Sequence, residues 1–529
     1  MKIFFQHILI YPIITPLLAG AILLLLSETK RYARSLISIL SIMMQLITAA
    51  SLLYFSADCG NNICIYAIGG WPAPFGIFLV SDKLTIIMLI LTSILGFCSF
   101  LYALGHWDRI GVHFYPLFQF LMMGLNGAFL TGDLFNLFVF FEVLLAASYG
   151  LMLHGSGSMR VSASLHYIVV NLVVSFLILI GIALIYGVTG TLNLADVAIS
   201  AIELEEENRL FFNVGIAILG IAFIIKAGVW PLNFWLIKGY IAAVPPVTAM
   251  LSIMTKLSIY TVLRIKSLLI ILHEIPIPFD LNWIFYIGLV TLIFGCIGLI
   301  ASYQVEKISG YCIIISTGIL FMSLGMPGIN FIGPALFYLV NSVLASSTLF
   351  LLSELIKRTN IPISNCLTNQ DVFEAEEVLT KTSSNRSDEI VGIPIPAAMA
   401  FLGLSFISCA LLITGLPPLS GFVAKFALLS TAVSIDQVSY QIQSWILFAS
   451  ILFSGLAGLF SFTRIGIRIF WSKDTVIPFL RWVEVAPIGI LIFLCIDLSI
   501  NANLVLSYLN DAAKSLGNPF DYINTVLNF

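Results

Sequence analysis

The sequence predicts an all-α polytopic membrane protein with about 14 transmembrane helices. Of its 529 residues, 60% are hydrophobic and only 10% are charged, and the mean hydropathy is +1.06. Soluble domains are roughly 45–50% apolar and about 25% charged. A membrane span needs about 20 apolar residues, and the chain offers fourteen such runs. They begin near residues 5, 35, 80, 113, 134, 165, 210, 247, 281, 308, 333, 395, 444 and 482.

The distribution of Lys and Arg predicts the topology, because short cytoplasmic loops carry the excess of positive charge. If both termini face outside, 15 of the 24 Lys and Arg residues lie on the cytoplasmic side and three fall inside spans. The external residues are then Lys2, Lys83, Arg209, Arg264, Lys266 and Lys514. The first apolar run, to Leu26, is longer than the roughly 7–15 residues of a signal-peptide core, so we expect a retained span.

The stretch before the third span is predicted to be an external loop rich in Gly and Pro, from Ala57 to Val80. Cys59 and Cys64 lie in it, either as a disulfide or as two unpaired thiols. None of the eight cysteines has the spacing of a metal or cluster site. Asp82 opens the third span, where helix capping is favoured over a role in ion access.

The fifth span carries a carboxylate in its apolar centre. The fifth span follows the very short turn Thr131-Gly132-Asp133, so the fourth and fifth spans are predicted to be antiparallel neighbours. Asp133 can cap the fifth helix, but Glu142 lies more than two turns inside. A charge at the bilayer centre costs about 2.5–3.5 kcal/mol on insertion scales, so it usually has a use and a partner. His166 opens the sixth span, where a structural role is commoner than proton transfer.

Two hydrophilic stretches separate groups of spans. The loop from Gly187 to Arg209 contains an acidic run, which is either a solvated surface, the commoner case, or a mouth that concentrates cations. The acidic run consists of Glu203, Glu205, Glu206 and Glu207. The stretch from Lys357 to Gly392 is too polar to cross a membrane and too short for a domain, so we expect a flexible cytoplasmic loop.

Two spans are interrupted by proline close to a lysine. Pro231 follows shortly after Lys226, and the pair Pro417-Pro418 precedes Lys425. Proline cannot continue the helical hydrogen-bond ladder, and broken helices at membrane depth often mark ion sites in transporters. The likeness of the two interruptions suggests an internal repeat.

Four charges inside spans can form a route for protons. Removal from water weakens the hold of a lysine on its proton, and a nearby carboxylate restores it. Glu142, Lys226, Lys256 and Lys425 could therefore pass protons from one to the next, bridged by water, or could be static ion pairs that hold helices together. The sequence shows no nucleotide-binding loop, arranged nucleophile or haem-ligation motif, so transport without a cofactor or metal is predicted, and not catalysis.

Two long stretches resemble the D subunit of the multisubunit Mrp/Pha-type cation/proton antiporters, a family related to the antiporter-like membrane subunits of respiratory complex I. One is TGDLFNLFVFFEVLLAASYGL, from Thr131 to Leu151, and the other runs from Lys226 through PPVTAMLSIMTKLSIYTVLR to Arg264. GVTGTLNLAD and TGLPPLSGFVAKF are similar to the Pha-like branch in particular. The resemblance extends from about the third span to the thirteenth.

The resemblance implies two inverted five-helix repeats with broken helices 7 and 12. The expected units are spans 1–3 (1–112), a first repeat of spans 4–8 (113–265), a second repeat of spans 9–13 (281–475, with the loop 357–392), and span 14 with a tail (476–529). It also implies that Glu142 pairs with Lys226, that Lys256 bridges, and that Lys425 is the lysine of helix 12.

The eleventh span departs from the family pattern. Asn341 stands near the position of a His in many relatives, and Ser346 near that of a Lys in several. Because Asn cannot titrate, proton passage at this point would need water.

The implied function is that of a proton-conducting subunit of a monovalent cation (Na+ or K+)/proton antiporter in a bacterial plasma (inner) membrane. The implied partners are A-, C-, E-, F- and G-like subunits, the two ions and membrane lipids, with no nucleic acid. One alternative is an antiporter-like membrane-arm subunit of a quinone-linked NADH dehydrogenase or hydrogenase complex. The other is a scaffold with inert charges.

Overall fold

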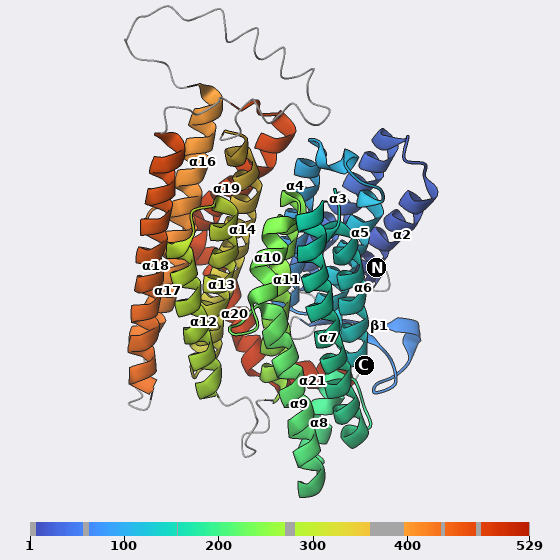
Figure 1. Cartoon of the computed structure of the whole chain (residues 1–529). Coiled ribbons are helices and arrows are strands. Elements are labelled where there is room, and N and C mark those ends of the chain that lie inside the picture. The colour runs from blue at the N-terminus through green and yellow to red at the C-terminus, as the bar shows by residue number, and fades with distance from the viewer. Residues whose placement is uncertain are drawn as a thin grey trace, which may run out of the picture.

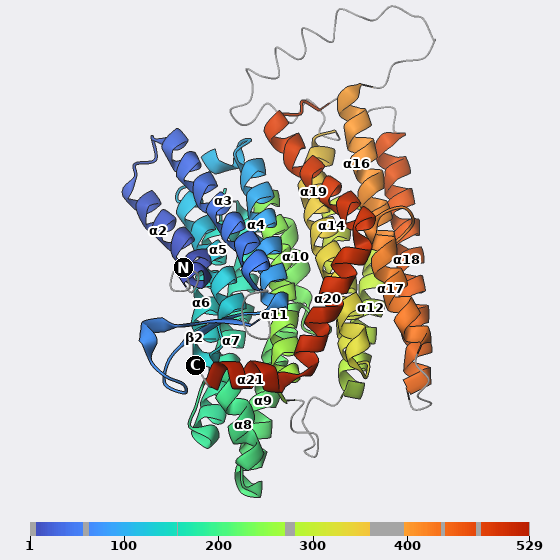
Figure 2. The ribbon, with the colours of Figure 1, turned by 180° about the vertical axis from the view of Figure 1, so that it is seen from behind.

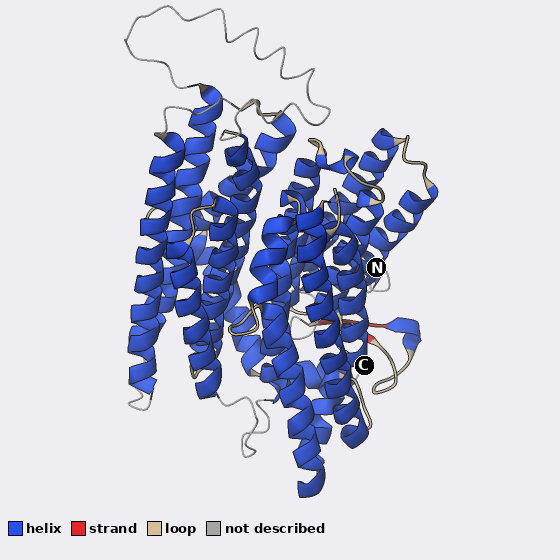
Figure 3. Cartoon of the chain, viewed as in Figure 1, coloured by secondary structure: helices blue, strands red, loops and turns tan. Residues whose placement is uncertain are grey.

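The chain folds into a bundle of helices with a single small β-hairpin among the residues described (Figure 1, Figure 3). The structure is a computed structural model that describes residues 7–56, 63–155, 157–269, 281–359, 396–434, 440–471 and 478–527. The expected cytoplasmic loop lies almost wholly outside these residues, as does Cys59.

Thirteen helices within the described ranges are long and apolar enough to cross a membrane. They are η1 with α2 (His7–Ile10, Tyr11–Leu25), α3 (Arg31–Phe55), α4 (Lys83–Ala103), α6 (Leu134–Met152), α7 (Ser158–Thr189), α9 (Glu206–Ala227), α11 (Pro245–Leu269), α12 (Leu281–Ala301), α13 (Val305–Leu324), η6 with α14 (Ile329–Phe331, Ile332–Arg358), α16 (Ala397–Thr414), α18 (Gln441–Phe470) and α19 (Trp482–Ile500). The apolar helix α5 (Phe114–Leu130) is only slightly shorter. The predicted polytopic all-α fold is confirmed.

The helix that carries Lys256, α11, lies at the centre of the bundle with α13 and α14. In Figures 1 and 2, α2 to α11 form one side and α12 to α19 the other. The two sides meet where α11 of the first packs against α13 and α14 of the second. The most apolar stretch of α11 is 100% buried and that of α13 and α14 is 89% buried, against 33% in α16. The outer helices therefore present apolar side chains to lipid, while the central helices are surrounded by protein.

Five shorter α-helices, the hairpin and the 3-10 helices η4 (Ile68–Gly70) and η5 (Trp107–Arg109) complete the described fold. α8 (Leu194–Glu203), α10 (Phe234–Ala242), α17 (Ser420–Val433), α20 (Ala502–Gly517) and α21 (Pro519–Leu527) lie between or after the spans, with β1 (Cys64–Ala67) and β2 (Phe78–Ser81). The segments expected as plain loops at 57–80 and 187–209 therefore contain strands and a helix. The strands pair in antiparallel register with Cys64 opposite Ser81, and Cys64 is disulfide-bonded.

The short turn between α5 and α6 is fixed by backbone pairing. The Gly132 N–H donates to the Phe78 carbonyl at 2.9 Å, and the Gly132 carbonyl accepts from the Leu194 N–H at 2.9 Å. A Cβ atom at Gly132 would lie 3.0 Å from Val80 Cγ2 and 3.2 Å from the Tyr522 hydroxyl. Glycine therefore allows strand, loop and C-terminal helix to meet closely here, and a larger residue would have to push a neighbour aside.

Two predicted positions need correction. α7 begins at Ser158, so His166 lies two turns inside the helix and does not open it. Arg264 and Lys266 were expected in an external loop, but α11 continues to Leu269 and only 7% of Arg264 is exposed. The division into two inverted repeats stays a prediction.

Candidate functional site

Glu142 and Lys226 lie within electrostatic range of each other, although their charged atoms make no ion-pair contact. Glu142 projects from the middle of α6, and Lys226 lies in the last turn of α9 with 5% of its surface exposed. The Phe141 and Phe223 rings, one from each helix, lie 5.7 Å apart. The Lys226 ammonium lies 4.7 Å from the centroid of the Phe141 ring and interacts electrostatically with Glu142.

Neither charge of this pair is satisfied by a hydrogen bond within the described residues. Glu142 Oε1 and Lys226 Nζ are both buried polar atoms without a hydrogen-bond partner. A buried charge that lacks hydrogen bonds is costly, so Lys226 depends on the attraction of Glu142 and on the face of Phe141. A change in the charge or position of Glu142 should therefore alter the stability of the charged form of Lys226.

The first helix break lies directly after Lys226. α9 ends at Ala227, Gly228 adopts a φ of 77°, and α10 begins at Phe234, with Pro231 between them. The Ile225 carbonyl at this end accepts from Trp235 Nε1 at 3.3 Å, and the Ala227 carbonyl accepts from Thr317 Oγ1 at 3.3 Å. The Ile225 carbonyl also accepts from the Gly228 N–H at 3.0 Å, so a capping backbone bond and side chains of α10 and α13 together satisfy these carbonyls at the break.

Lys256 lies in α11, the most buried of the described spans, and is 1% exposed. Its Nζ donates to Ser316 Oγ of α13 at 2.6 Å. Ser316 in turn donates to the Ile313 carbonyl at 2.7 Å. Lys256 therefore faces the second half of the molecule, toward α13 and α14.

Lys425 follows the second break. α16 ends at Thr414 and α17 begins at Ser420, with Pro417 and Pro418 in the gap. Lys425 Nζ donates to the Thr414 carbonyl at 2.9 Å, and the residue is 6% exposed. A cation is favoured there, because the C-terminal end of a helix carries partial negative charge.

A polar cavity lies between the partner of Lys256 and Lys425. Its volume is about 20 Å³, and a cavity needs about 10–15 Å³ to hold a water molecule. Its polar lining is Ser316, Tyr338, Asn341, Ser342, Ser346, Ser454 and Lys425. Asn341 Oδ1 also accepts from Ser420 Oγ at 2.7 Å. The two non-titrating residues predicted to need water thus line a cavity with room for it.

Asp133 and His166 are not brought to this axis by any contact among the described residues. Asp133 caps α6, where its Oδ1 accepts from the Asn136 N–H at 2.8 Å. Burial raises the pKa of the Asp133 carboxyl, and the backbone N–H groups it accepts from oppose that rise. His166 is exposed, and its Nδ1 lies 2.8 Å from the Ser162 carbonyl of its own helix.

Sequence reasoning missed several groups that contact the lysines or Asn341. Ser316, Ser420 and the Thr414 carbonyl each make a hydrogen bond at the site. A serine in an apolar helix carries no signal of its own, and a backbone carbonyl has none in any sequence. The described residues contain no group of three or more His, Cys, Asp or Glu side chains that could hold a metal ion.

Charges buried at membrane depth, broken helices and a small polar cavity are typical of ion-translocating membrane proteins. The model of the family described as "NADH:quinone oxidoreductase/Mrp antiporter, TM" matches residues 131–454 of this chain. The chain belongs to this family.

Full-length relatives are antiporter subunits by name. The chain is 42% identical over 532 residues to the D subunit of a "Probable K(+)/H(+) antiporter" of Rhizobium meliloti, covering 99% of this chain and 98% of that one. It is 33% identical over 530 residues to the D subunit of an "Na(+)/H(+) antiporter" of Alkalihalophilus pseudofirmus, covering 99% of both. A chain in the structure of the Mrp complex from Dietzia sp. DQ12-45-1b matches with a TM-score of 0.82 at 25% identity, again over 99% of both.

Proposed function

We propose that this protein is the proton-conducting subunit of a multisubunit monovalent cation/proton antiporter, and that protons move along Glu142, Lys226, Lys256 and Lys425. The observation that carries the proposal is the Glu142–Lys226 pair beside a helix break, in which Glu142 Oε1 and Lys226 Nζ are buried atoms without a hydrogen-bond partner among the described residues. A static structural pair gains most from well-formed hydrogen bonds, whereas a pair that exchanges protons must be easily disturbed.

The arrangement allows one proton transfer to control the next. While Glu142 is charged and close, Lys226 retains its proton, and when Glu142 moves away or is neutralised the proton is held less tightly. The next lysine, Lys256, contacts Ser316 at the edge of the polar cavity. Water in that cavity would connect Ser316 with Lys425, across the stretch where Asn341 and Ser346 cannot titrate.

The setting of this activity follows from the relatives. Because full-length relatives are named as antiporter subunits, we infer assembly with A-, C-, E-, F- and G-like subunits in a bacterial plasma membrane. The transported cation is Na+ or K+, as in the names of those relatives. On this proposal the chain moves ions and catalyses no covalent chemistry.

The first prediction tests the charge pair. Glu142→Ala and Lys226→Ala should each lower exchange by about tenfold or more, since losing about 1.4 kcal/mol of barrier stabilisation already costs a factor of ten. Exchange is measured as dissipation of a preset ΔpH on adding Na+ and then K+ to vesicles that contain the assembled complex. The same assay shows which cation is carried.

Two exposed residues provide matched controls. Glu207→Ala removes an acid at the start of α9, and Lys238→Ala removes a lysine on the exposed face of α10. Both should exchange at the wild-type rate. Normal exchange in Glu142→Ala and Lys226→Ala, at wild-type amounts of assembled complex, would refute the proposal and favour inert charges.

A different experiment separates the antiporter from a redox-linked membrane arm. Mass spectrometry of the purified complex should find antiporter subunits as the stoichiometric partners. Flavin-binding and iron–sulfur subunits in equal amounts would show that the chain serves a quinone-linked oxidoreductase.

A further inference from the structure

A buried ion pair joins the C-terminal part of α11 to the start of α4. Arg264 Nη1 donates to Asp82 Oδ2 at 2.6 Å, and Arg264 Nη2 donates to Asp82 Oδ1 at 2.9 Å. Asp82 is 3% exposed and Arg264 7%. The sequence predicted Asp82 as a helix cap, and it does accept from the Thr85 N–H at 2.9 Å, but it also binds Arg264 with both oxygens.

The pair is enclosed by further polar contacts. Thr85 Oγ1 donates to Asp82 Oδ1 at 2.8 Å and lies 3.1 Å from the Tyr260 hydroxyl. Tyr260 donates to the Phe129 carbonyl at 2.7 Å and lies 3.2 Å from Arg264 Nη2. Burial alone would raise the pKa of the Asp82 carboxyl, but the charge and hydrogen bonds of Arg264 outweigh it and the pKa is lowered. Asp82 is thus held as a carboxylate.

The C-terminal helix closes the pair from the membrane face on which α8 and α21 lie (Figure 2). The Tyr522 ring of α21 lies 5.4 Å from the Arg264 guanidinium carbon, as does the Tyr260 ring on the other side. Tyr522 is 6% exposed. This face carries the β-hairpin and is the one expected outside.

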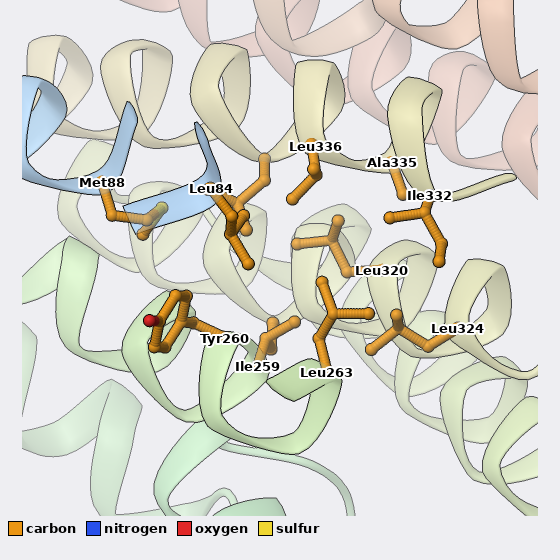
Figure 4. A pocket seen from close by; sticks show the side chains of 11 residues that line it. Leu84, Met88, Ile259, Tyr260, Leu263, Leu320, Leu324, Ile332, Ala335 and Leu336 are labelled. Carbon is orange, nitrogen blue, oxygen red and sulfur yellow. The ribbon is translucent and has the colours of Figure 1, made fainter. Parts of the chain in front are cut away.

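Lys256, Tyr260 and Arg264 lie on one face of α11, each a helical turn from the next. Beside Tyr260 is a cavity bounded by α4, α11, α13 and α14 and lined by apolar side chains, among them Leu84, Leu263 and Leu320 (Figure 4). The Tyr260 hydroxyl points away from the leucines. Apolar cavities stay dry, so this cavity offers no polar route from Lys256 toward the ion pair.

We propose that the Asp82–Arg264 pair and the dry cavity beside Tyr260 form a gate that closes the route between Lys256 and the α8/α21 face. Opening would separate the pair and let water into the cavity. A positive charge on Lys256 repels Arg264 and attracts Asp82, which acts to separate them. Arg264 would then keep its existing contacts with the Tyr260 hydroxyl and with the Tyr260 and Tyr522 rings. Opening therefore does not leave the Arg264 guanidinium without partners.

A purely structural role explains this pair less well. Replacing a buried ion pair by apolar residues is often neutral or stabilising, so stability alone does not require one in an apolar bundle. A gate does require charge, because a desolvated ion pair responds to a proton arriving nearby whereas packed leucines do not. The Asp82–Arg264 pair lies on the Lys256 face of α11 and contacts Tyr522. At this position, such a response would control access to Lys256 from the α8/α21 face.

The test measures passive proton leak of the whole complex in proteoliposomes, as decay of a preset ΔpH without Na+ or K+. Asp82→Asn should leak several-fold faster than the wild type. The matched control is Asp108→Asn, since Asp108 is also buried, binds Arg31 and accepts from the Tyr115 hydroxyl at 2.6 Å, but lies beyond the opposite end of α4. It should leak no faster than the wild type.

A second variant leaves the ion pair intact. Leu320→Ser places a hydroxyl in the dry cavity and should also increase the leak, and it decides the matter if Asp82→Asn does not assemble. If the assembled Asp82→Asn and Leu320→Ser complexes both leak at the wild-type rate, the gate is refuted. It is also refuted if Asp108→Asn leaks as fast as Asp82→Asn. The inference rests on the proposed function, but the readouts differ: Glu142→Ala tests exchange, whereas these variants test leak.

Discussion

At the scale of single residues, Lys226 differs from the two other buried lysines of the axis. Lys256 and Lys425 each donate a hydrogen bond, to Ser316 and to the Thr414 carbonyl, whereas Lys226 Nζ has no hydrogen-bond acceptor among the described residues. Charged hydrogen bonds are worth about 1.5–3 kcal/mol each. The protonated state of Lys226 is therefore the one most dependent on a single neighbour, Glu142.

The polar cavity gives a residue-scale prediction. Asn341→Leu keeps a similar volume but removes the acceptor of Ser420 and one polar wall of the cavity. Without polar partners a water molecule is not retained there. Exchange should fall by about tenfold or more, which corresponds to roughly 1.4 kcal/mol, and is measured in vesicles at matched amounts of complex.

Asn171→Leu is the matched control for this change. Asn171 is also buried, but its amide donates to the Tyr167 carbonyl of its own helix at 2.9 Å. This variant should exchange like the wild type. A wild-type rate in Asn341→Leu would show that the cavity does not lie on the proton route.

The sequence indicated the titrating members of the site but not their surroundings. Glu142 and the lysines stand out because charge is rare in spans. Ser316 and Ser420 do not, because serine is ordinary in membrane helices and its role depends on which helix faces it. The distribution of Lys and Arg alone placed Arg264 on the external side, and only the packing of α4 against α11 reveals that Asp82 is its partner.

At the scale of elements, the two helix breaks use their lysines in different ways. Lys425 stands after its break and binds the carbonyl that α16 leaves open. Lys226 stands before its break, where Trp235 and Thr317 satisfy the carbonyls. Its ammonium is therefore not required to cap the helix end and remains available to Glu142. The second lysine stabilises its break, and the first does not.

The close pair α12–α13 gives an element-scale prediction. A Cβ atom at Gly318 would lie 2.7 Å from the Leu292 nitrogen and 2.8 Å from the Gly288 carbonyl oxygen, both backbone atoms that cannot move aside. Gly318→Ala should therefore destabilise the packing of the two helices, by about 1–3 kcal/mol for overpacking. A lower melting temperature of the purified complex is the measurement.

The control lies on the same helix. A Cβ atom at Gly310 would have no neighbour nearer than 3.9 Å, at Ile237, so Gly310→Ala adds a methyl group without a clash. It should melt at or slightly above the wild-type temperature. Equal melting temperatures for the two variants would show that the α12–α13 contact yields more readily than its geometry indicates.

The starts of most spans were predictable to within a few residues because apolar length alone specifies them, but α7 begins at Ser158, about two turns before the predicted 165. α6 and α12 begin at the predicted residues, 134 and 281. The hairpin, α8 and α20–α21 were not predictable in this way. They are short, amphipathic or extended segments whose form depends on the surface they pack against, as the hydrogen bonds of Gly132 with β2 and the start of α8 show.

At the scale of the whole molecule, α20 and α21 form a strap across the two sides of the bundle (Figure 2). α20 packs on α14 and η6 from the second side and on α4 from the first, and α21 reaches α8. The strap therefore couples the positions of the two sides at the face where the Asp82–Arg264 pair lies. Its own attachment decides how firmly that face is closed.

Two contacts of α20 predict what holds the strap. Leu509 is completely buried, whereas Asp511 is exposed and pairs with Lys83 at 3.5 Å. Leu509→Ala should cost about 2–5 kcal/mol, the range for large-to-small changes in cores. Asp511→Ala should cost less than about 1 kcal/mol, since exposed ion pairs contribute little. Melting of the purified complex and protease cleavage within α20–α21 report the two effects.

The contributions of Asp511 and Leu509 to the attachment of the strap also differ in their pH dependence. The hydrogen bond from Lys514 and the charge of Lys83 lower the pKa of Asp511, so its small contribution is present at neutral pH and is lost as the pH falls below the usual Asp value of about 4. The apolar contact of Leu509 has no such dependence. If the strap is held by packing, its protection from protease should persist in the wild type from neutral pH down to about 3, into the range in which Asp511 loses its charge, and should be lost throughout in Leu509→Ala. The reverse pattern, with Asp511→Ala the more easily cleaved, would mean that charge and not apolar burial closes the α8/α21 face.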